Sequence, residues 1–175
     1  NARGEWRWMS SRETIFSKAA DGKTKQIVGV DQDISDRKAK EQKIRQQLAA
    51  MEASVDGIAI VNPNGIFTYS NNALAKIFGY SDADAMVGQS WQDLYDREVV
   101  DYVESDVVPI VLAKGTWQGE LVGNKEDGSH FSVEVSITAI AGGNGVCIYR
   151  DVSDRKQAEA ETREAYQRFQ SILDN

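Results

Sequence analysis

The sequence has few of the residues that build metal sites, disulfides and membrane spans. Its 175 residues include one cysteine, Cys147, and one histidine, His130. A single cysteine excludes an internal disulfide and fits a reducing compartment, and one histidine with one cysteine cannot by themselves supply a metal site. The longest apolar run, residues 107–113, is far shorter than the ~20 residues of a membrane helix. We therefore expect no membrane contact by this chain and a cytoplasmic location.

A basic run and a nucleotide-binding loop are also missing. The 20 Lys and Arg residues are outnumbered by 27 Asp and Glu residues, which gives a net charge of −7 with both signs interspersed. Nucleic acids select a basic face, so we expect no nucleic-acid partner. The glycines of residues 142–145 lie between two expected strands, where they offer a phosphate no helix N-terminus.

One six-residue motif is present twice. Asp33-Ile34-Ser35-Asp36-Arg37-Lys38 returns 118 positions later as Asp151-Val152-Ser153-Asp154-Arg155-Lys156, with five of the six residues identical. Each copy ends a strand-like stretch and precedes a charged, helix-forming run. Because the spacing is that of a domain, the repeat predicts modules in series. In each copy we expect the serine hydroxyl to cap the helix by accepting a backbone N–H of the first turn.

The stretch around the first copy predicts two strands and a helix. Aromatic and β-branched residues over residues 4–34 flank the turn signal Asp21-Gly22. Residues 36–55 then predict a helix whose apolar positions are spaced by 4, 3 and 4 residues. This narrow seam is explained either by a helix that lies on its neighbouring domain or by a short parallel coiled coil. The seam consists of Ile44, Leu48, Met51 and Val55.

The centre of the chain predicts short strands around several helices. Strands at 58–61 and 66–69 flank an Asn-Pro-Asn-Gly turn, and Asn71 with Asn72 can cap a short helix that ends at Gly79. Residues 90–114 are helical in period, but Pro109 breaks a helix interior. We therefore expect one helix to end near Ser105 and a second to begin near Val107. Three further strands are predicted at 116–122, 131–140 and 146–150.

A second helical seam follows the second copy of the motif. Residues 154–173 predict a helix with apolar or small residues at spacings of 4, 3, 4 and 3. We expect this helix, like the first, to take part in a homodimer. Its seam consists of Ala158, Thr162, Ala165, Phe169 and Ile172.

Taken together, these elements resemble a PAS domain with its C-terminal PAC motif. The resemblance is carried by residues 71–74 (Asn-Asn-Ala-Leu), 78–81 (Phe-Gly-Tyr-Ser), 115–121 (Gly-Thr-Trp-Gln-Gly-Glu-Leu), 125–128 (Lys-Glu-Asp-Gly) and the repeated motif. It implies an α+β fold, in which a five-stranded antiparallel sheet carries short helices on one face and is flanked by connector helices. Residues 56–153 resemble a complete domain and residues 1–35 the closing strands of a preceding, truncated one. Residues 36–55 are then a connector helix, and residues 154–175 a signalling helix that leads to a further module.

The resemblance also bears on cofactors. Trp91 stands where light-sensing flavin relatives carry their reactive cysteine, and Gly123 and Val133 stand at the two asparagine positions that grip the flavin ring. Residues 96–114 contain no histidine that could ligate haem. Covalent flavin chemistry and His-ligated haem are therefore disfavoured, whereas FAD held without a covalent bond remains an alternative.

The resemblance implies a small internal cavity and a coupling between sheet and helix. Either the cavity residues enclose a ligand or they fill the core, and both interpretations remain open. At the second motif, Asp151 is expected to pair with a basic partner, for which Arg155 is the candidate; Asp33 and Arg37 hold the same positions in the first. The cavity residues are Phe78, Trp91, Leu121, Val133, Cys147 and Tyr149.

From these features we expect a sensory or signal-relay module of a tandem-PAS bacterial protein such as a sensor histidine kinase. It would act between adjacent PAS and output domains. The alternatives are a redox or ligand sensor that binds FAD or another small molecule, and a part of a cyclic-di-GMP signalling enzyme. No enzyme activity is expected in the chain itself, because its one histidine, His130, begins a strand rather than lying on a helix beside an acidic residue.

Overall fold

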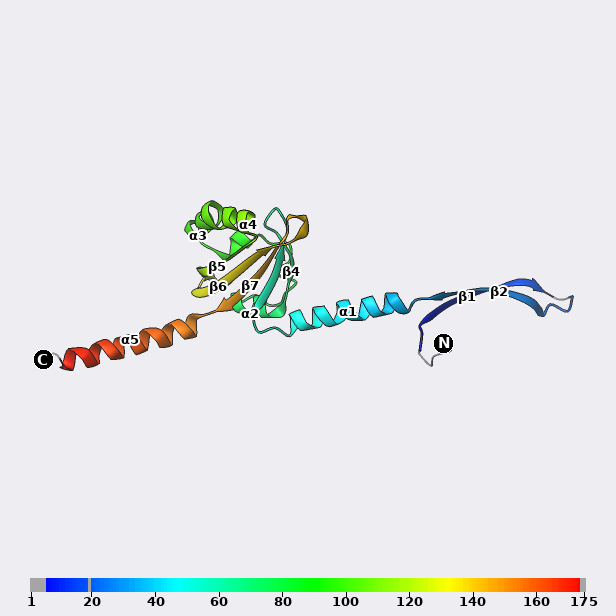
Figure 1. Cartoon of the computed structure of the whole chain (residues 1–175), viewed down its shortest axis with the longest axis horizontal. Helices are drawn as coiled ribbons and strands as arrows, with labels where there is room; N and C mark the ends of the chain where they lie inside the picture. The colour runs from blue at the N-terminus through cyan, green and yellow to red at the C-terminus, as the bar shows by residue number, and fades with distance from the viewer. Residues whose placement is uncertain (1–5, 19, 174–175) are drawn as a thin grey trace. The chain divides into compact units, whose positions relative to one another are not determined.

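The computed structural model describes residues 6–18 and 20–173, and for residues 171–173 the backbone alone. The chain divides into two compact units, Asn1–Ala50 and Met51–Asn175. In chain order the elements are β1 (Met9–Lys18), β2 (Thr24–Asp33), α1 (Ser35–Glu52), β3 (Gly57–Val61), β4 (Phe67–Ser70), α2 (Asn72–Phe78), η1 (Trp91–Leu94), α3 (Arg97–Tyr102), η2 (Val103–Val107), α4 (Val108–Lys114), β5 (Thr116–Asn124), β6 (His130–Ala139), η3 (Ala141–Gly143), β7 (Gly145–Asp151) and α5 (Ser153–Leu173) (Figure 1).

The first unit contains an antiparallel hairpin of β1 and β2 and most of α1. Met9 pairs with Asp33 and Arg12 with Val30, and Gly22 takes a positive φ of 81° in the connecting turn. Apolar side chains of the hairpin, such as Ile15 and Val30, are 52% and 68% exposed. Two strands alone bury no stable sheet face, so this hairpin leaves apolar surface without a covering layer.

The second unit is built on a five-stranded antiparallel sheet. Its strand order is β4-β3-β7-β6-β5, so β3 and β7 are neighbours although they are far apart in the sequence. The alternation predicted from the sequence decides which face is buried: Phe131, Val133 and Val135 of β6 are buried, and the residues between them are not. The expected α+β fold, a five-stranded antiparallel sheet with short helices and flanking helices, is confirmed.

The helices contribute the other half of the core. Leu74 and Phe78 of α2 and Val107 of η2 are fully buried among the residues that face them from the sheet. Asn71 caps α2 by accepting a hydrogen bond from the backbone N–H of Leu74 at 3.0 Å, and Gly79 ends the helix with a φ of 82°. Both ends of this helix lie where the sequence predicts them.

The helical run over residues 97–114 differs from the expectation in its middle. No break separates two helices; instead α3 passes into η2, a π-helical turn, and then into α4. In the π turn the N–H of Val108 reaches the carbonyl of Val103, five residues back. Pro109, which has no N–H to donate, then lies in the first turn of α4, where a helix tolerates proline.

The connector helix α1 ends earlier than expected, at Glu52 rather than at residue 55. The carbonyl oxygen of Met51 instead accepts hydrogen bonds from the backbone N–H of Ser54, at 3.3 Å, and from Nδ2 of Asn71, at 2.9 Å. Val55 therefore lies outside the helix, with 91% of its surface exposed, and it is not a member of the α1 seam.

Among the described residues, no helix combines the length and the hydrophobicity that crossing a membrane requires.

Candidate functional site

The first copy of the repeated motif forms a hydrogen-bonded joint between β2 and α1. Asp33 Oδ1 accepts the backbone N–H of Ser35 at 2.9 Å, and Ser35 Oγ accepts the backbone N–H of Trp8 at 2.9 Å. The N–H of Ile34 donates to the carbonyl of Trp8 at 2.8 Å, and Lys38 N–H then closes the first helical turn on Ile34 at 3.0 Å. The strand end, the adjacent strand and the first turn of the helix are thus bonded together. We call this set the first joint.

The second copy makes the same set of bonds between β7 and α5. Asp151 Oδ1 accepts the N–H of Ser153 at 2.9 Å, and Ser153 Oγ accepts the N–H of Ser132 at 3.3 Å. The N–H of Val152 donates to the carbonyl of Ser132 at 3.0 Å, and Lys156 N–H donates to the carbonyl of Val152 at 3.0 Å. We call this set the second joint. The repeat in sequence is therefore a repeat in hydrogen bonding.

The expected role of the two serines needs correction. Each hydroxyl accepts a backbone N–H from outside its own helix: Ser35 from Trp8, directly before β1, and Ser153 from Ser132 of β6. The aspartate two residues earlier accepts the N–H at the start of the helix, as short polar side chains do in Asx turns. The serine therefore fastens the helix start to the sheet.

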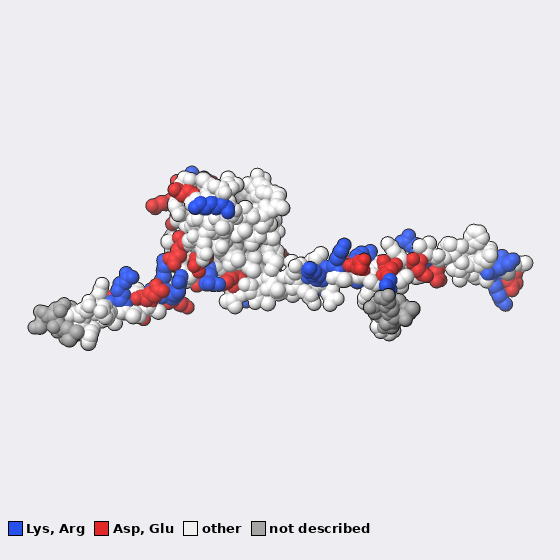
Figure 2. Space-filling view, viewed as in Figure 1, with Lys and Arg blue, Asp and Glu red and all other residues white. Residues whose placement is uncertain are grey.

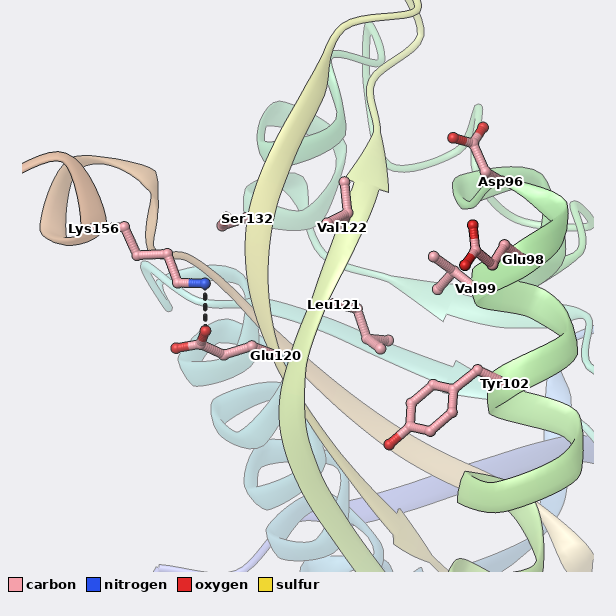
Figure 3. Close-up of a pocket in the computed structure, with 9 residues that line it drawn as sticks. All are labelled: Asp96, Glu98, Val99, Tyr102, Glu120, Leu121, Val122, Ser132 and Lys156. Carbon is pink, nitrogen blue, oxygen red and sulfur yellow. Dashed lines mark ion pairs between the residues drawn. The ribbon is translucent and has the colours of Figure 1, made fainter. Parts of the chain in front are cut away.

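The expected ion pair at the second joint also has different partners. Arg155 Nη2 lies 3.2 Å from Glu120 Oε1, and Lys156 Nζ lies 2.5 Å from Glu120 Oε2, so both cations bind β5 and not Asp151. Figure 3 shows the Glu120–Lys156 pair on one side of β5, with Leu121 directed to the other side. The hydrogen bond from Lys156 holds the pKa of the Glu120 carboxyl below its ordinary value. The first turn of α5 is thereby tied to β5, the edge strand, as well as to β6.

At the first joint the charged residues pair differently again. Asp33 Oδ2 lies 2.8 Å from Arg7 Nη1, while Arg37 pairs with Glu41 along the exposed face of α1. The backbone N–H of Ser35 is the main cause of the lowered pKa of the Asp33 carboxyl. The backbone hydrogen bonds are therefore common to both joints, and the ion pairs are particular to each.

Within the second unit, Asn71 binds the last turn of α1 at Met51. This side chain is fully buried, and its Oδ1 accepts the N–H groups of Ile58 and Leu74 at 2.8 and 3.0 Å. Its Nδ2 donates to the carbonyls of Met51 and Asp56 at 2.9 and 3.1 Å. One amide thus joins the last turn of α1, strand β3 and the start of α2. Its role as helix cap could be predicted from the sequence, but its other three bonds could not.

A second connection runs from the segment after α1 to the strand that ends at the second joint. Arg150 donates two hydrogen bonds to the Asp56 carboxylate, from Nε at 2.9 Å and from Nη2 at 2.6 Å. This bidentate geometry is the strong form of an Arg–carboxylate pair, and the hydrogen bond from Arg150 lowers the pKa of Asp56. Arg150 directly precedes Asp151, so the Asp56–Arg150 pair reaches the second joint.

The residues expected around an internal cavity belong to one buried cluster or pack against it. Phe78, Val133, Cys147 and Tyr149 are buried together, and the Phe78 ring meets Tyr149 edge-on at 5.7 Å. Leu121 is buried in the same cluster, and Trp91 is partly buried against it, with its ring 6.1 Å from that of Tyr95. Tyr95, which sequence reasoning missed, is also buried against Phe78, at 6.5 Å.

Burial governs the chemistry of the two titratable groups predicted for this cluster. Cys147 is 4% exposed, and burial raises the pKa of its thiol to about 11. Burial also raises the pKa of the Tyr149 hydroxyl well above its ordinary value. Both groups are therefore neutral at physiological pH, so neither of them introduces a charge into this part of the core.

His130 lies at the first residue of β6, where its Nε2 is 3.0 Å from Asp96 Oδ2. The other oxygen of this carboxylate, Oδ1, accepts a hydrogen bond from Nδ2 of Asn124 at 2.6 Å. Within the described residues, no three His, Cys, Asp or Glu side chains gather as a metal site would require.

Comparison with known proteins gives three results. A family model described as PAS domain matches residues 55–154. The nitrogen fixation regulatory protein of Klebsiella pneumoniae is 24% identical over 129 residues, which is 71% of this chain but 26% of that protein. The chain therefore spans about a quarter of the length of this relative.

Solved structures with the same fold include the PAS domain of a protein from Colwellia psychrerythraea. It has a TM-score of 0.60 and 23% identity, and the match covers 64% of this chain and 98% of that one. A domain of a sensory box sensor histidine kinase/response regulator from Geobacter sulfurreducens has a TM-score of 0.52 and 23% identity, with 67% and 99% covered. At these identities the likeness concerns the fold.

Proposed function

The chain belongs to the PAS domain family, and from this premise we propose that it relays conformational signals within a bacterial sensor protein, such as a sensor histidine kinase. In this proposal a change in the PAS sheet moves α5, and a change at α1 reaches the sheet. The parent protein would hold further PAS domains and an output domain in series. The relatives named for signalling support this class of function.

The observation that carries the proposal is the pair of joints. Two segments 118 positions apart make the same backbone hydrogen bonds, each between a strand end, its neighbour strand and a helix start. A plain helix cap needs only one such bond. A serine that bonds the adjacent strand adds a mechanical connection, because the helix start cannot turn without straining the sheet.

Replacing Asp151 by alanine tests the second joint. The variant loses the acceptor for Ser153 N–H, so we expect faster hydrogen–deuterium exchange over about the first two turns of α5, with β6 and β7 still protected. Asp154→Ala is the matched control, since it removes a carboxylate from the same turn but none of the hydrogen bonds of the joint. Equal effects of the two substitutions, or no effect on α5, would refute the role given to the joint.

We extend the proposal to a homodimer formed through α1 and α5. The seam residues that are described on these helices are exposed or half-buried in a single copy, for example Ile44 at 56% and Phe169 at 59%. The side chain of Ile172 lies outside the described residues. Exposed apolar side chains spaced by three and four residues suit pairing with a second helix.

Light scattering coupled to size exclusion measures this association. We expect a dimer for the unmodified chain and a monomer for the double variant Ile44→Asp, Phe169→Asp. The control variant Gln46→Asp, Gln167→Asp adds the same charge on the other faces of the two helices and should remain dimeric. A monomer mass for the unmodified chain would exclude the dimer.

The proposal assigns no reaction to the chain and places it in the cytoplasm. The position of His130, an exposed residue that begins β6 and bonds Asp96, supports the first of these two assignments. Figure 2 shows acidic and basic residues interspersed along α1 and α5, with no continuous basic face in this view, which supports proteins rather than nucleic acids as partners.

We assign the hairpin of the first unit to a preceding PAS domain. Its strands β1 and β2 carry the first joint in the way that β6 and β7 carry the second, with Met9 opposite Asp33 as Val133 is opposite Asp151. In that assignment the exposed apolar residues of the hairpin are the part of a sheet that the rest of the preceding domain covers.

A further inference from the structure

An apolar pocket of about 230 Å³ lies in the second unit, where α4 meets the turn after β3 and the turn between β6 and β7. Of the residues expected around an internal cavity, only Trp91 lines it, so it is a different place from the buried core. Its volume is smaller than the ~300–1,000 Å³ of most ligand sites. The pocket therefore suits a molecule smaller than a typical drug or cofactor.

One wall of the pocket is an apolar stripe of α4 that the described part of the chain leaves uncovered. Val108, Val111 and Leu112 are spaced by three and four residues, which places them on one face of the helix. None of them is buried, and Val108 and Leu112 are 39% and 79% exposed. Val61 of β3 and Ile137 of β6 also line the pocket. Apolar side chains of a helix and two strands thus surround a space that no described side chain fills.

A glycine leaves room beside the indole of Trp91. A Cβ on Gly65 would lie 2.7 Å from Trp91 Nε1, closer than side chains approach one another, and the φ of Gly65 is 77°. The backbone N–H of Trp91 donates to the carbonyl of Gly65 at 3.0 Å, and a capping box at Ser90 fixes the start of η1. The N–H edge of the indole is therefore held against a part of the wall that has no side chain.

Two N–H donors of the pocket have no partner within the described residues. One is Nε1 of Trp91. The other is Nδ2 of Asn62, whose Oδ1 accepts the N–H groups of Asn64 and Ile66 at 2.9 and 3.1 Å. Both side chains are half-buried, and none of the residues that line the pocket is ionisable. Because a charge enclosed here would have no counter-charge, the pocket favours a neutral molecule that brings a hydrogen-bond acceptor.

We propose that this pocket binds a small neutral carbonyl compound, in which an aliphatic or aromatic body carries the carbonyl oxygen. The oxygen accepts the Nε1–H of Trp91, and the body lies on Val111, Leu112 and Ile137. Nδ2 of Asn62 is a further donor for a compound that has a second oxygen. Apolar walls with a few polar groups that fix the orientation are typical of sites for small molecules.

The pocket and the second joint lie at opposite ends of the same strands. Ala139 of β6 and Gly145 of β7 line the pocket, whereas Ser132 of β6 and Asp151 of β7 belong to the joint. The two ends of β7 are about 20 Å apart, at ~3.4 Å per residue, and Figure 1 shows α4 at the end of the sheet opposite to the start of α5. A molecule bound between α4 and these strand ends would act on α5 through the strands. This consequence rests on the proposed relay, whereas binding itself does not.

Binding is tested by NMR titration of the chain with three probes that share one ring: cyclohexanone, cyclohexylamine and cyclohexanecarboxylate. We expect the neutral ketone alone to shift amide resonances within residues 61–65, 108–112 and 143–145. It should also move the indole N–H resonance of Trp91, which is identified by its loss in Trp91→Phe. That variant keeps an aromatic ring and should weaken ketone binding by about fivefold, as expected for one lost hydrogen bond.

A second pair of variants tests the apolar wall without disturbing the core. Leu112→Gln changes a largely exposed side chain of the pocket and should weaken ketone binding by about threefold, because apolar contact is lost. Val122→Gln is the control, since Val122 is a 48% exposed apolar residue of β5 that does not line the pocket. It should leave the affinity unchanged.

The outcomes separate the site from its consequence. Equal shifts by the charged probes, an unmoved Trp91 indole resonance, or equal effects of the two glutamine substitutions would overturn the site. A changed mass of Leu112→Gln in light scattering would also overturn it, because the α4 stripe would then be a contact between copies. Ketone binding that leaves the amides of residues 153–160 unmoved would confirm the site and reject its coupling to α5. Absence of saturable ketone binding in the millimolar range would overturn the inference and leave the relay to its own test at Asp151.

Discussion

At the scale of single residues, burial and hydrogen bonding set the chemistry of the chain. Cys147 is buried and its thiol pKa is raised to about 11, whereas Glu120 is an exposed carboxyl whose pKa is lowered by Lys156. The first shift makes a residue inert, and the second keeps a carboxylate charged where it ties a helix to a strand. The cysteine therefore packs the core, and the glutamate belongs to the second joint.

The thiol of Cys147 should react slowly with Ellman's reagent at pH 8. A pKa of about 11 leaves at least about 100-fold less thiolate than an unperturbed cysteine has at this pH, and burial restricts access further. We expect a correspondingly slow reaction in the folded chain and a fast one after denaturation. Because the chain has one cysteine, no second thiol obscures the rate. A folded-state rate within about tenfold of the denatured one would contradict the buried placement.

The carboxyl of Glu120 should titrate below its ordinary value of 4.5. Its lowered pKa means that its stabilising contribution is present above 4.5 and is lost as the pH falls through the folded-state value. Carbon NMR of the side-chain carboxyl should show this, and Lys156→Met should raise the pKa toward 4.5. Lys114→Met removes the same charge at the end of α4 and should leave the titration unchanged. If both variants behave alike, the pairing with Lys156 is wrong.

At the scale of elements, local sequence patterns predict most of the strands and one helix well. The alternation of Phe131, Val133 and Val135 marks the buried face of β6, and the Asn71 and Gly79 signals mark the two ends of α2. The π turn before Pro109 was not predicted, because the missing N–H of the proline indicated a break between two helices rather than a wider turn within a continuous run.

Contacts between distant elements could not be predicted from the sequence. Asp56 and Arg150 are 94 residues apart, and no local pattern indicates that β3 and β7 lie side by side. The serines of the repeated motif were assigned to their own helices because a single sequence shows the helix start but not the neighbouring strand. For the same reason, the sequence did not indicate Glu120 as the partner of Arg155 and Lys156.

Asn71 offers the sharpest test at this scale. Its side chain makes four hydrogen bonds in a fully buried position, so Asn71→Ala leaves several buried groups without partners. We expect the free energy of unfolding, measured with urea, to fall by about 3 kcal/mol. Asn72→Ala, at an exposed neighbour bonded to Glu52, should cost less than about 1 kcal/mol. Similar losses for the two variants would contradict the role of Asn71 as a central fastener.

At the scale of the whole molecule, the chain contains two joints and a series of contacts that leads to the second of them. The last turn of α1 is fastened by Asn71, the segment after it is bound by Arg150, and Arg150 precedes the joint from which α5 begins. A relay through this path requires two arrangements with different stabilities. A change that favours one of them at Asp56 must then be felt in α5.

The most direct test of the relay compares the amide NMR spectra of Asp56→Ala and the unmodified chain. Asp56→Ala removes the carboxylate that binds Arg150, and Asp101→Ala, which breaks the exposed pair with Arg97 on α3, is the control. We expect Asp56→Ala to shift resonances beyond the second joint, through residues 153–160, and Asp101→Ala to leave them unchanged. Shifts that stop at Asp151, leaving α5 unchanged, would contradict the claim that this domain transmits a signal to its outgoing helix.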